Sequence, residues 1–337
     1  PIRRACALNV QEAMQKPSPQ HPDRRAERIS GWIEAGLYVL TIAILSVSNA
    51  FAISQGAHPI VFILYSLVIS AVGMLIYTGP GNEPIRVMLN PLSWFVGLGI
   101  IGVEVSFCLI LLTLSPAEAN IILRLSIPLA LLLGWIIFRR SPGTGAWIGA
   151  AIVAAGVGSL LFTVDLSTQA IGLFYGVIAA ASICLRGFAS EFHPWNRAAR
   201  SVFEKIRITG LVVLVTGLAG LFLVGLAATL VGLGFAERSN LLPAPADLWH
   251  WPTIVLALFV GSLIFATMSY LQFSSVVKIE TENFIATSAF MPLAAALVQS
   301  LAVSIGLIDA VVFDWRLLPG SILIIAGVML LIATRRS

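Results

Sequence analysis

The stretches EANIILRLSIPLA at residues 118–130 and ENFIATSAFMPLA at residues 282–294 decide the fold that we expect for this chain. Each stretch begins with a glutamate and reaches Pro-Leu-Ala ten residues later, so the two are offset by 164 residues. Pro128 and Pro292 occupy the same place in both. Self-similarity at a fixed offset is typical of an internal repeat, and we therefore expect two similar halves.

The segments that flank these two stretches repeat as well. Ahead of them, Gly36-Leu37-Tyr38 resembles Gly172-Leu173-Phe174. Behind them, glycines match at an offset of 171 residues, namely Gly149 and Gly156 in the first half and Gly320 and Gly327 in the second. Chance does not readily produce three similarities in the same order.

The repeat lies in a chain of ten apolar runs. A bilayer-spanning helix needs about 20 mostly apolar residues, and glycine and proline separate many of the runs. The runs are residues 32–54, 58–78, 91–114, 116–138, 143–163, 169–190, 203–234, 252–273, 282–306 and 317–334. We expect an all-α integral membrane protein with ten transmembrane helices.

The composition excludes an ordinary soluble protein. Hydrophobic residues make up 58% of the 337 residues and charged residues only 11%, and the mean hydropathy is +0.96. Because a soluble domain carries about 25% charged residues, lipid must be the solvent for much of this chain. The net charge of +4 does not indicate nucleic-acid binding, since the basic residues lie at the ends of apolar runs.

Lysine and arginine residues predict the orientation. With the N-terminus inside and alternating spans, seventeen of the 20 fall on the inner side, a group that includes Arg186. Only Arg238 and Arg316 fall on the outer side, and Arg124 falls within a span. This bias follows the positive-inside rule. We expect both termini in the cytoplasm and a location in the cell membrane, most readily a bacterial inner membrane.

The repeat also predicts the domain organisation. Residues 1–31 are polar and are expected to form a flexible cytoplasmic tail, followed by five-helix repeats at residues 32–163 and 164–337. Because five is odd, the second repeat must cross the bilayer in the opposite sense. In transporters, such an inverted repeat places the solute site near the midplane between the halves, which rock to alternate access.

Two motifs of the first half extend this interpretation. They are Ser115-Pro116-Ala117-Glu118-Ala119 followed by Pro128 and Gly134-Trp135, and Trp147-Ile148-Gly149-Ala150-Ala151 followed by Ala155-Gly156-Val157. The motifs resemble the fourth and fifth helices of EamA-type proteins in the drug/metabolite transporter superfamily. The resemblance implies a 5+5 carrier with cytoplasmic termini, in a family of mostly metabolite and amino-acid exporters. Arg124 departs from the family pattern, which usually has an acidic or small residue just before this proline.

Two charged residues lie inside apolar runs, where charge is costly and usually functional. Glu104 in the third run and Arg124 in the fourth lie at depths of roughly 16 and 12 Å from the turn at Ser115-Pro116, at 1.5 Å per residue. Their similar depth predicts a salt bridge. The pair could be structural, or it could line a solute cavity, with Arg124 binding a carboxylate and Glu104 binding an amine or taking up a proton.

Neutral polar residues complete the candidate site. Asn120 shares a helix face with Arg124, and Ser288 is the repeat partner of Arg124. The other candidates, each of which could instead form a helix-to-helix hydrogen bond, are Tyr65, Ser106, Ser182, Tyr270 and Asn283. Pro128 and Pro292 would bend their helices. The four repeated glycines would let the fifth and tenth helices pack closely, or would support a dimer contact.

We expect a secondary-active transporter, an exporter of small organic metabolites such as amino acids or their derivatives, that is monomeric or weakly dimeric. The alternative is a membrane-embedded enzyme or a non-transporting scaffold. The sequence has no HExxH, GxSxG or Walker motif, and its histidines and three cysteines show no metal-site spacing. We therefore expect no catalytic residue, cofactor or metal.

Overall fold

The computed structural model describes residues 24–161, 166–308 and 317–334, and all regular secondary structure in these ranges is helical. Eight helical segments in the described ranges are long and apolar enough to cross a membrane, and α8 (Thr144–Leu161) and α17 (Leu317–Thr334) are shorter apolar helices. The eight segments are α2 (Arg24–Ser54), α3 (Pro59–Thr78), α5 (Pro91–Ile110), α6–η1–α7 (Pro116–Ile122, Leu123–Leu125 and Ser126–Ile136), α9 (Leu166–Phe192), α11 (Val202–Gly232), α12–α13–η2–α14 (Pro245–Leu248, Trp251–Phe259, Val260–Phe265 and Ala266–Ile279) and α15–η3–α16 (Thr281–Thr287, Ser288–Phe290 and Met291–Ser304). Two short helices, α4 (Pro84–Met88) and α10 (Pro194–Ala198), lie in connections. The chain is an all-α protein whose apolar helices fit a multi-pass membrane protein.

Proline and serine residues begin several of these helices. Pro59, Pro91 and Pro116 occupy the first turn of α3, α5 and α6, where the missing N–H of proline costs no helical hydrogen bond. Ser115 and Glu118 form a reciprocal capping box at the start of α6. The Glu118 carboxylate therefore serves its own helix terminus.

Each half contains a 3-10 turn just before a proline. Pro128 has no N–H to donate to the carbonyl of Arg124, and Pro292 has none for the carbonyl of Ser288. The turns η1 and η3 contain these two carbonyl groups. The helix irregularities therefore lie about one turn before the prolines, at Leu123–Leu125 and Ser288–Phe290.

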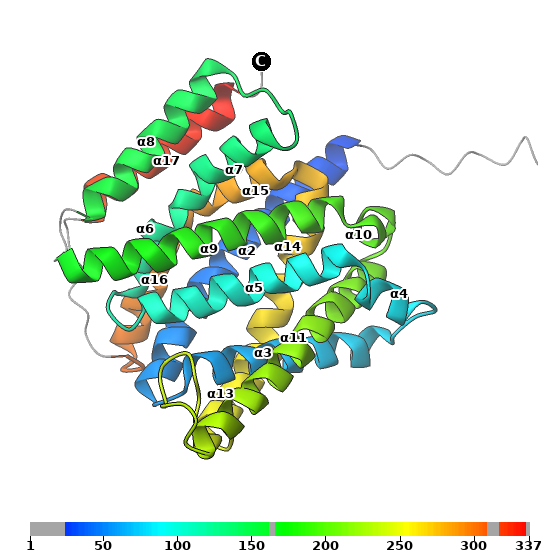
Figure 1. The fold of residues 1–337 in the computed structure, drawn as a ribbon. Coiled ribbons are helices and arrows are strands. Elements are labelled where there is room, and N and C mark those ends of the chain that lie inside the picture. Colours follow the sequence, from blue (N-terminus) through cyan, green and yellow to red (C-terminus); the bar gives the residue numbers. More distant parts are fainter. Residues whose placement is uncertain (1–23, 162–165, 309–316, 335–337) are drawn as a thin grey trace, which may run out of the picture.

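The helices pack in pairs that join the two halves (Figure 1). α5 packs against α9, α2 against α14, α3 against α11, and α6 against α16. At one edge α8 lies along α17. A Cβ atom on Gly149 would lie 2.4 Å from the carbonyl oxygen of Gly327, and one on Gly156 would lie 2.8 Å from that of Gly320. These glycines therefore lie where α8 and α17 approach each other most closely, with no room for a larger side chain.

The predicted tail and one predicted loop residue need correction. α2 begins at Arg24, so residues 24–31 are helical instead of flexible. Nζ of Lys278 on α14 donates to Oγ of Ser30 at 3.0 Å and to Oε1 of Glu34 at 2.5 Å, which ties the extension down. Residues 1–23, and the expected boundary between the halves near residue 164, lie outside the described residues. Arg186 does not lie in an inner loop but is buried within α9.

Candidate functional site

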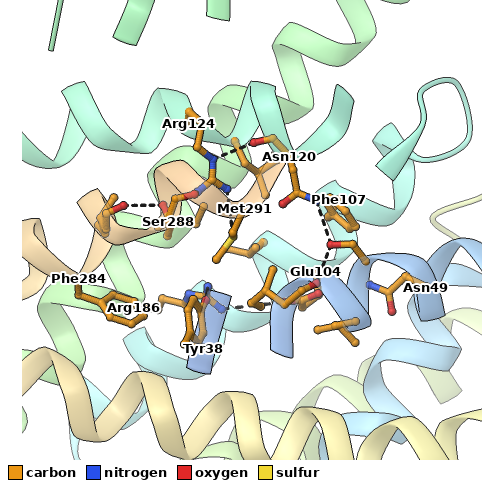
Figure 2. Close-up of a pocket in the computed structure, with 17 residues that line it drawn as sticks. Tyr38, Asn49, Glu104, Phe107, Asn120, Arg124, Arg186, Phe284, Ser288 and Met291 are labelled. Atoms are coloured by element: carbon orange, nitrogen blue, oxygen red, sulfur yellow. Dashed lines mark hydrogen bonds and ion pairs between the residues drawn. The ribbon is translucent and has the colours of Figure 1, made fainter. Parts of the chain in front are cut away.

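A small cavity lies between helices of both halves (Figure 2). It is lined from the first half by α2, α5 and α6–η1, and from the second by α9, α15–η3 and the first residue of α16. The space open to the centres of water molecules is about 30 Å³, which is room for one or two waters. The polar lining residues are Tyr38, Ser46, Asn49, Glu104, Asn120, Arg124, Arg186 and Ser288. The remaining lining residues are apolar.

Arg124 is 1% exposed and reaches across this cavity wall. Its Nε donates to the Asn120 carbonyl at 2.8 Å, Nη1 donates to the Ser288 carbonyl, and Nη2 lies 3.4 Å from Sδ of Met291. The Ser288 carbonyl is the group that Pro292 leaves without its helical donor. That carbonyl also accepts the backbone N–H of Met291, so the side chain of Arg124 adds a second donor to it and joins η1 to η3.

The salt bridge predicted between Glu104 and Arg124 is not formed, because Arg186 takes that place. Nη1 of Arg186 lies 4.0 Å from Oε1 of Glu104, and Nη2 donates to the hydroxyl of Tyr38. Gly99 on α5 permits the approach, since a Cβ there would lie 2.6 Å from Cβ of Arg186. Figure 2 shows Arg186 between Tyr38 and Glu104, away from Arg124.

Sequence reasoning missed Arg186 and Tyr38 as site residues. Arg186 falls within the predicted apolar run 169–190, four residues from its end. A charged residue inside an apolar run is the sequence feature that identifies it as a candidate site residue. The alternation of spans instead places it among the inner-side residues. Tyr38 was noted only as part of the repeat.

Several polar atoms in the cavity wall have no hydrogen-bond partner. They are Nε and Nη1 of Arg186, Oδ1 of Asn120 and both side-chain polar atoms of Asn49. The other polar atom of Asn120, Nδ2, donates to Oγ of Ser46 at 3.0 Å. Leaving a buried polar group unsatisfied costs about 1–3 kcal/mol each. Such a concentration of unsatisfied groups is expected where a ligand or water binds.

Four of the nine predicted site residues line the cavity, namely Glu104, Asn120, Arg124 and Ser288. The hydroxyl of Tyr65 instead donates to the Leu248 carbonyl at 2.8 Å, and Nδ2 of Asn283 donates to the Ile279 carbonyl at 2.7 Å. Ser182 abuts Gly102 in the contact of α5 with α9. Ser106 lines a separate apolar groove, and Tyr270 packs against the core. Ser106 is two residues from Glu104, or about 200° around the helix, so the two cannot share a cavity face.

A second ionic group, the Arg140 cluster, consists of Arg140, Glu191 and Glu282. Arg140 follows α7 and forms ion pairs with Glu191 at the end of α9 and, at 2.5 Å, with Glu282 at the start of α15. The guanidinium carbon lies 5.7 Å from the ring centres of both Phe138 and Phe192. Burial alone would lower the pKa of Arg140, but the hydrogen bond to Glu191 and the charges of Glu282 and Glu191 raise it. Arg140 therefore stays charged and ties three helices together.

The Arg140 cluster lies just beyond one end of the cavity. Glu191 is five residues after Arg186 along α9, or about 7.5 Å along the helix axis. Glu282 is two residues before Phe284, which lines the cavity. Breaking these ion pairs would free the ends of α7, α9 and α15 to separate on that side.

Comparisons with known proteins bear on the fold alone. No protein-family model and no curated protein sequence matches the chain. Among solved structures 26 chains match. One of them, described only as "Crystal structure of protein", has a TM-score of 0.59 and 15% sequence identity, over 91% of this chain and 99% of that chain. The helical arrangement is therefore shared with a solved protein over nearly its whole length.

Proposed function

We propose that this chain is a secondary-active transporter that carries small organic metabolites across a membrane by alternating access. Its ten spans would form two inverted five-helix repeats, with α8 and α17 as the fifth and tenth spans. The carrying observation is the cavity, since helices of both halves line it and it holds Glu104, Arg124 and Arg186. Ionisable groups buried among membrane spans usually mark a solute or ion pathway.

The helix contacts support the inverted repeat. Helices at the same place in the two halves pack together, as α3 does with α11 and α8 with α17. The contact of α5 with α9 has its counterpart in that of α14 with α2, as a two-fold relation requires. Gly149 faces Gly327 while Gly156 faces Gly320, so α8 and α17 run in opposite directions. Arg124 bonds to Ser288, its own repeat partner, which is the contact expected near a two-fold axis.

Alternating access fits the size of the cavity and the closure beside it. A space of about 30 Å³ cannot hold a metabolite, so a solute requires the halves to move apart. The Arg140 cluster would hold one end of the cavity closed. The two halves would have two alternative packings, and switching between them would open the two ends of the cavity in turn. The 3-10 turns at Arg124 and Ser288 are the points where the helices beside the cavity could bend.

The remaining parts of the proposal come from the sequence. The EamA-type resemblance favours an exporter, and the distribution of lysine and arginine favours cytoplasmic termini in a bacterial inner membrane. The Arg140 cluster would then lie on the cytoplasmic side. Glu104 is the residue that would couple transport to protons. A monomer or weak homodimer would suffice, since both halves of the cavity belong to one chain.

Flux into proteoliposomes tests this proposal. The purified protein is reconstituted and offered a panel of amino acids, amines and organic acids, with and without a pH gradient, against protein-free liposomes. We expect saturable flux of at least one solute and its loss in Arg124→Gln. If a folded, correctly inserted protein moves no member of the panel above the liposome background, the result contradicts the proposed transport function and favours a membrane-embedded enzyme or a scaffold.

A further inference from the structure

The charges of the cavity wall do not balance. Its charged residues are two arginines, Arg124 and Arg186, and one glutamate, Glu104. All three are buried. With Glu104 ionised, the lining therefore carries one excess positive charge, and charge buried among membrane-spanning helices is costly.

Among the described residues that line the cavity, Glu104 is the only carboxylate. Two backbone carbonyls and one sulfur atom surround Arg124, and all three are neutral. Glu104 lies at 4.0 Å from Arg186, which is beyond hydrogen-bond distance. Nε and Nη1 of Arg186 are buried and make no hydrogen bond. The wall thus offers unused donors together with unneutralised charge.

We propose that the transported solute is an organic monoanion, whose negative charge is held by Arg186 and Arg124. The proposal rests on the transport function proposed above. A guanidinium group can form two parallel hydrogen bonds to a planar oxyanion such as a carboxylate, which suits it to this ligand better than the ammonium group of lysine. While Glu104 is ionised, binding one monoanion would bring the net charge of the cavity lining to zero.

The other charge classes fit the cavity less well. A cation would meet two guanidinium groups, and a zwitterion would leave the excess charge in place. A dianion would be repelled by Glu104. The apolar part of the lining includes Ile42, Val103, Phe107 and Phe284, so the body of the solute should be apolar. These features together select a carboxylate on a hydrocarbon or aromatic skeleton.

Thermal unfolding of the purified full-length chain, followed by tryptophan fluorescence, tests the charge preference without transport. The probes are two matched series at equal concentration: isovalerate, isovaleramide and isoamylamine, and phenylacetate, phenylacetamide and phenethylamine. We expect a carboxylate to raise Tm in at least one series, and the amide and amine of that series to have no effect. Stabilisation by an amide or amine equal to that by the carboxylate, or no stabilisation by either carboxylate, would overturn the proposal.

Variants identify the groups that hold the charge. Arg186→Gln and Arg124→Gln should abolish the carboxylate-dependent rise, Arg186→Lys should retain part of it, and Glu104→Gln should extend it to the dianion methylsuccinate. Arg238→Gln, which breaks an ion pair with Asp247 outside the cavity, is the control and should behave as wild type. An unchanged carboxylate response in both arginine-to-glutamine variants contradicts the assignment. Flux of only neutral or cationic solutes in proteoliposomes would overturn this inference and leave the transport function standing.

Discussion

Replacing Arg140 by glutamine should open the cavity on the side of the Arg140 cluster. Arg140 is the cation between two carboxylates that come from different helices, Glu191 on α9 and Glu282 on α15. Its removal leaves two neighbouring negative charges without the guanidinium that holds them together. Repulsion between these charges would favour separation of α9 and α15.

The exposures of the three side chains determine the expected magnitude. Glu282 is 3% and Glu191 7% exposed, whereas Arg140 is 25% exposed. Removing one partner of a fully buried pair costs about 3–5 kcal/mol. Because water reaches part of Arg140, we expect Arg140→Gln to lower the free energy of unfolding by about 2–3 kcal/mol. The exposed pair of Arg238 with Asp247 is the matched control, and Arg238→Gln should cost about 1 kcal/mol or less.

Thiol labelling measures the opening. A Ser46→Cys substitution places a thiol in the cavity wall, and a Cys6→Ser background removes the cysteine ahead of the first span. In inside-out vesicles, a membrane-impermeant maleimide should label this thiol at least about tenfold faster in Arg140→Gln than in the parent. A tenfold faster labelling rate corresponds to a decrease of about 1.4 kcal/mol in the free energy of opening the cavity.

A variant that removes all three charges separates opening from instability. Arg140→Gln combined with Glu191→Gln and Glu282→Gln should recover stability, because no buried charge is left unpaired. It should nevertheless label rapidly, since the ion pairs that tie the helices are absent. Labelling of Arg140→Gln at the parent rate, in a protein that remains folded, would refute the assignment of this cluster as the closure.

The other predictions concern pH, packing and topology. Burial lowers the pKa of His193 from its ordinary value of 6.5 to about 4, so the folded state favours the neutral imidazole. The stability that this preference provides is full above pH 6.5 and is lost as the pH falls toward 4. At pH 5 the free energy of unfolding should therefore be lower by about 2 kcal/mol. Denaturant unfolding at pH 8 and pH 5 should show this loss in wild type but not in His193→Gln. Gly149→Leu should destabilise the protein by about 1–3 kcal/mol through overpacking against α17, whereas Gly158→Ala, which has no neighbour within 4 Å, should not; equal unfolding midpoints would contradict the glycine contact. Reporter fusions at Arg140 and Lys205 should read cytoplasmic and those at Leu166 and Pro245 external, and an external signal at Lys205 would overturn the proposed orientation.

The helices of this chain could be predicted more fully than its site. Hydropathy and boundary prolines are local properties, so helices occupy all ten predicted runs, with ends such as Pro91 and Thr78 close to those expected. The start of α2 at Arg24 was missed because the contact of Lys278 with Ser30 and Glu34 is tertiary. Glu104 and Arg124 stood out because charge is rare in apolar runs. Their pairing was wrong, because equal depth below a turn does not reveal that α9 brings Arg186 between α5 and α2.

The two halves share a backbone design but differ in side chains, and the difference bears on mechanism. The repeat partners Glu118 and Glu282 both open a helix that reaches a 3-10 turn and a proline. Glu118 bonds to Ser115 within its own helix terminus, whereas Glu282 bonds to Arg140 of the other half. At the turns, Arg124 projects a cation and Ser288 supplies the carbonyl that receives it. The proposed inverted repeat would give the backbone two alternative packings of similar energy, and unequal side chains would determine which is preferred. Because the cross-half ion pair forms at Glu282 and not at Glu118, the packing seen here should be the one closed at the Arg140 cluster. In the opposite packing Arg140 would lose both carboxylates, so under the transport function proposed above the binding energy of the solute would have to offset that loss.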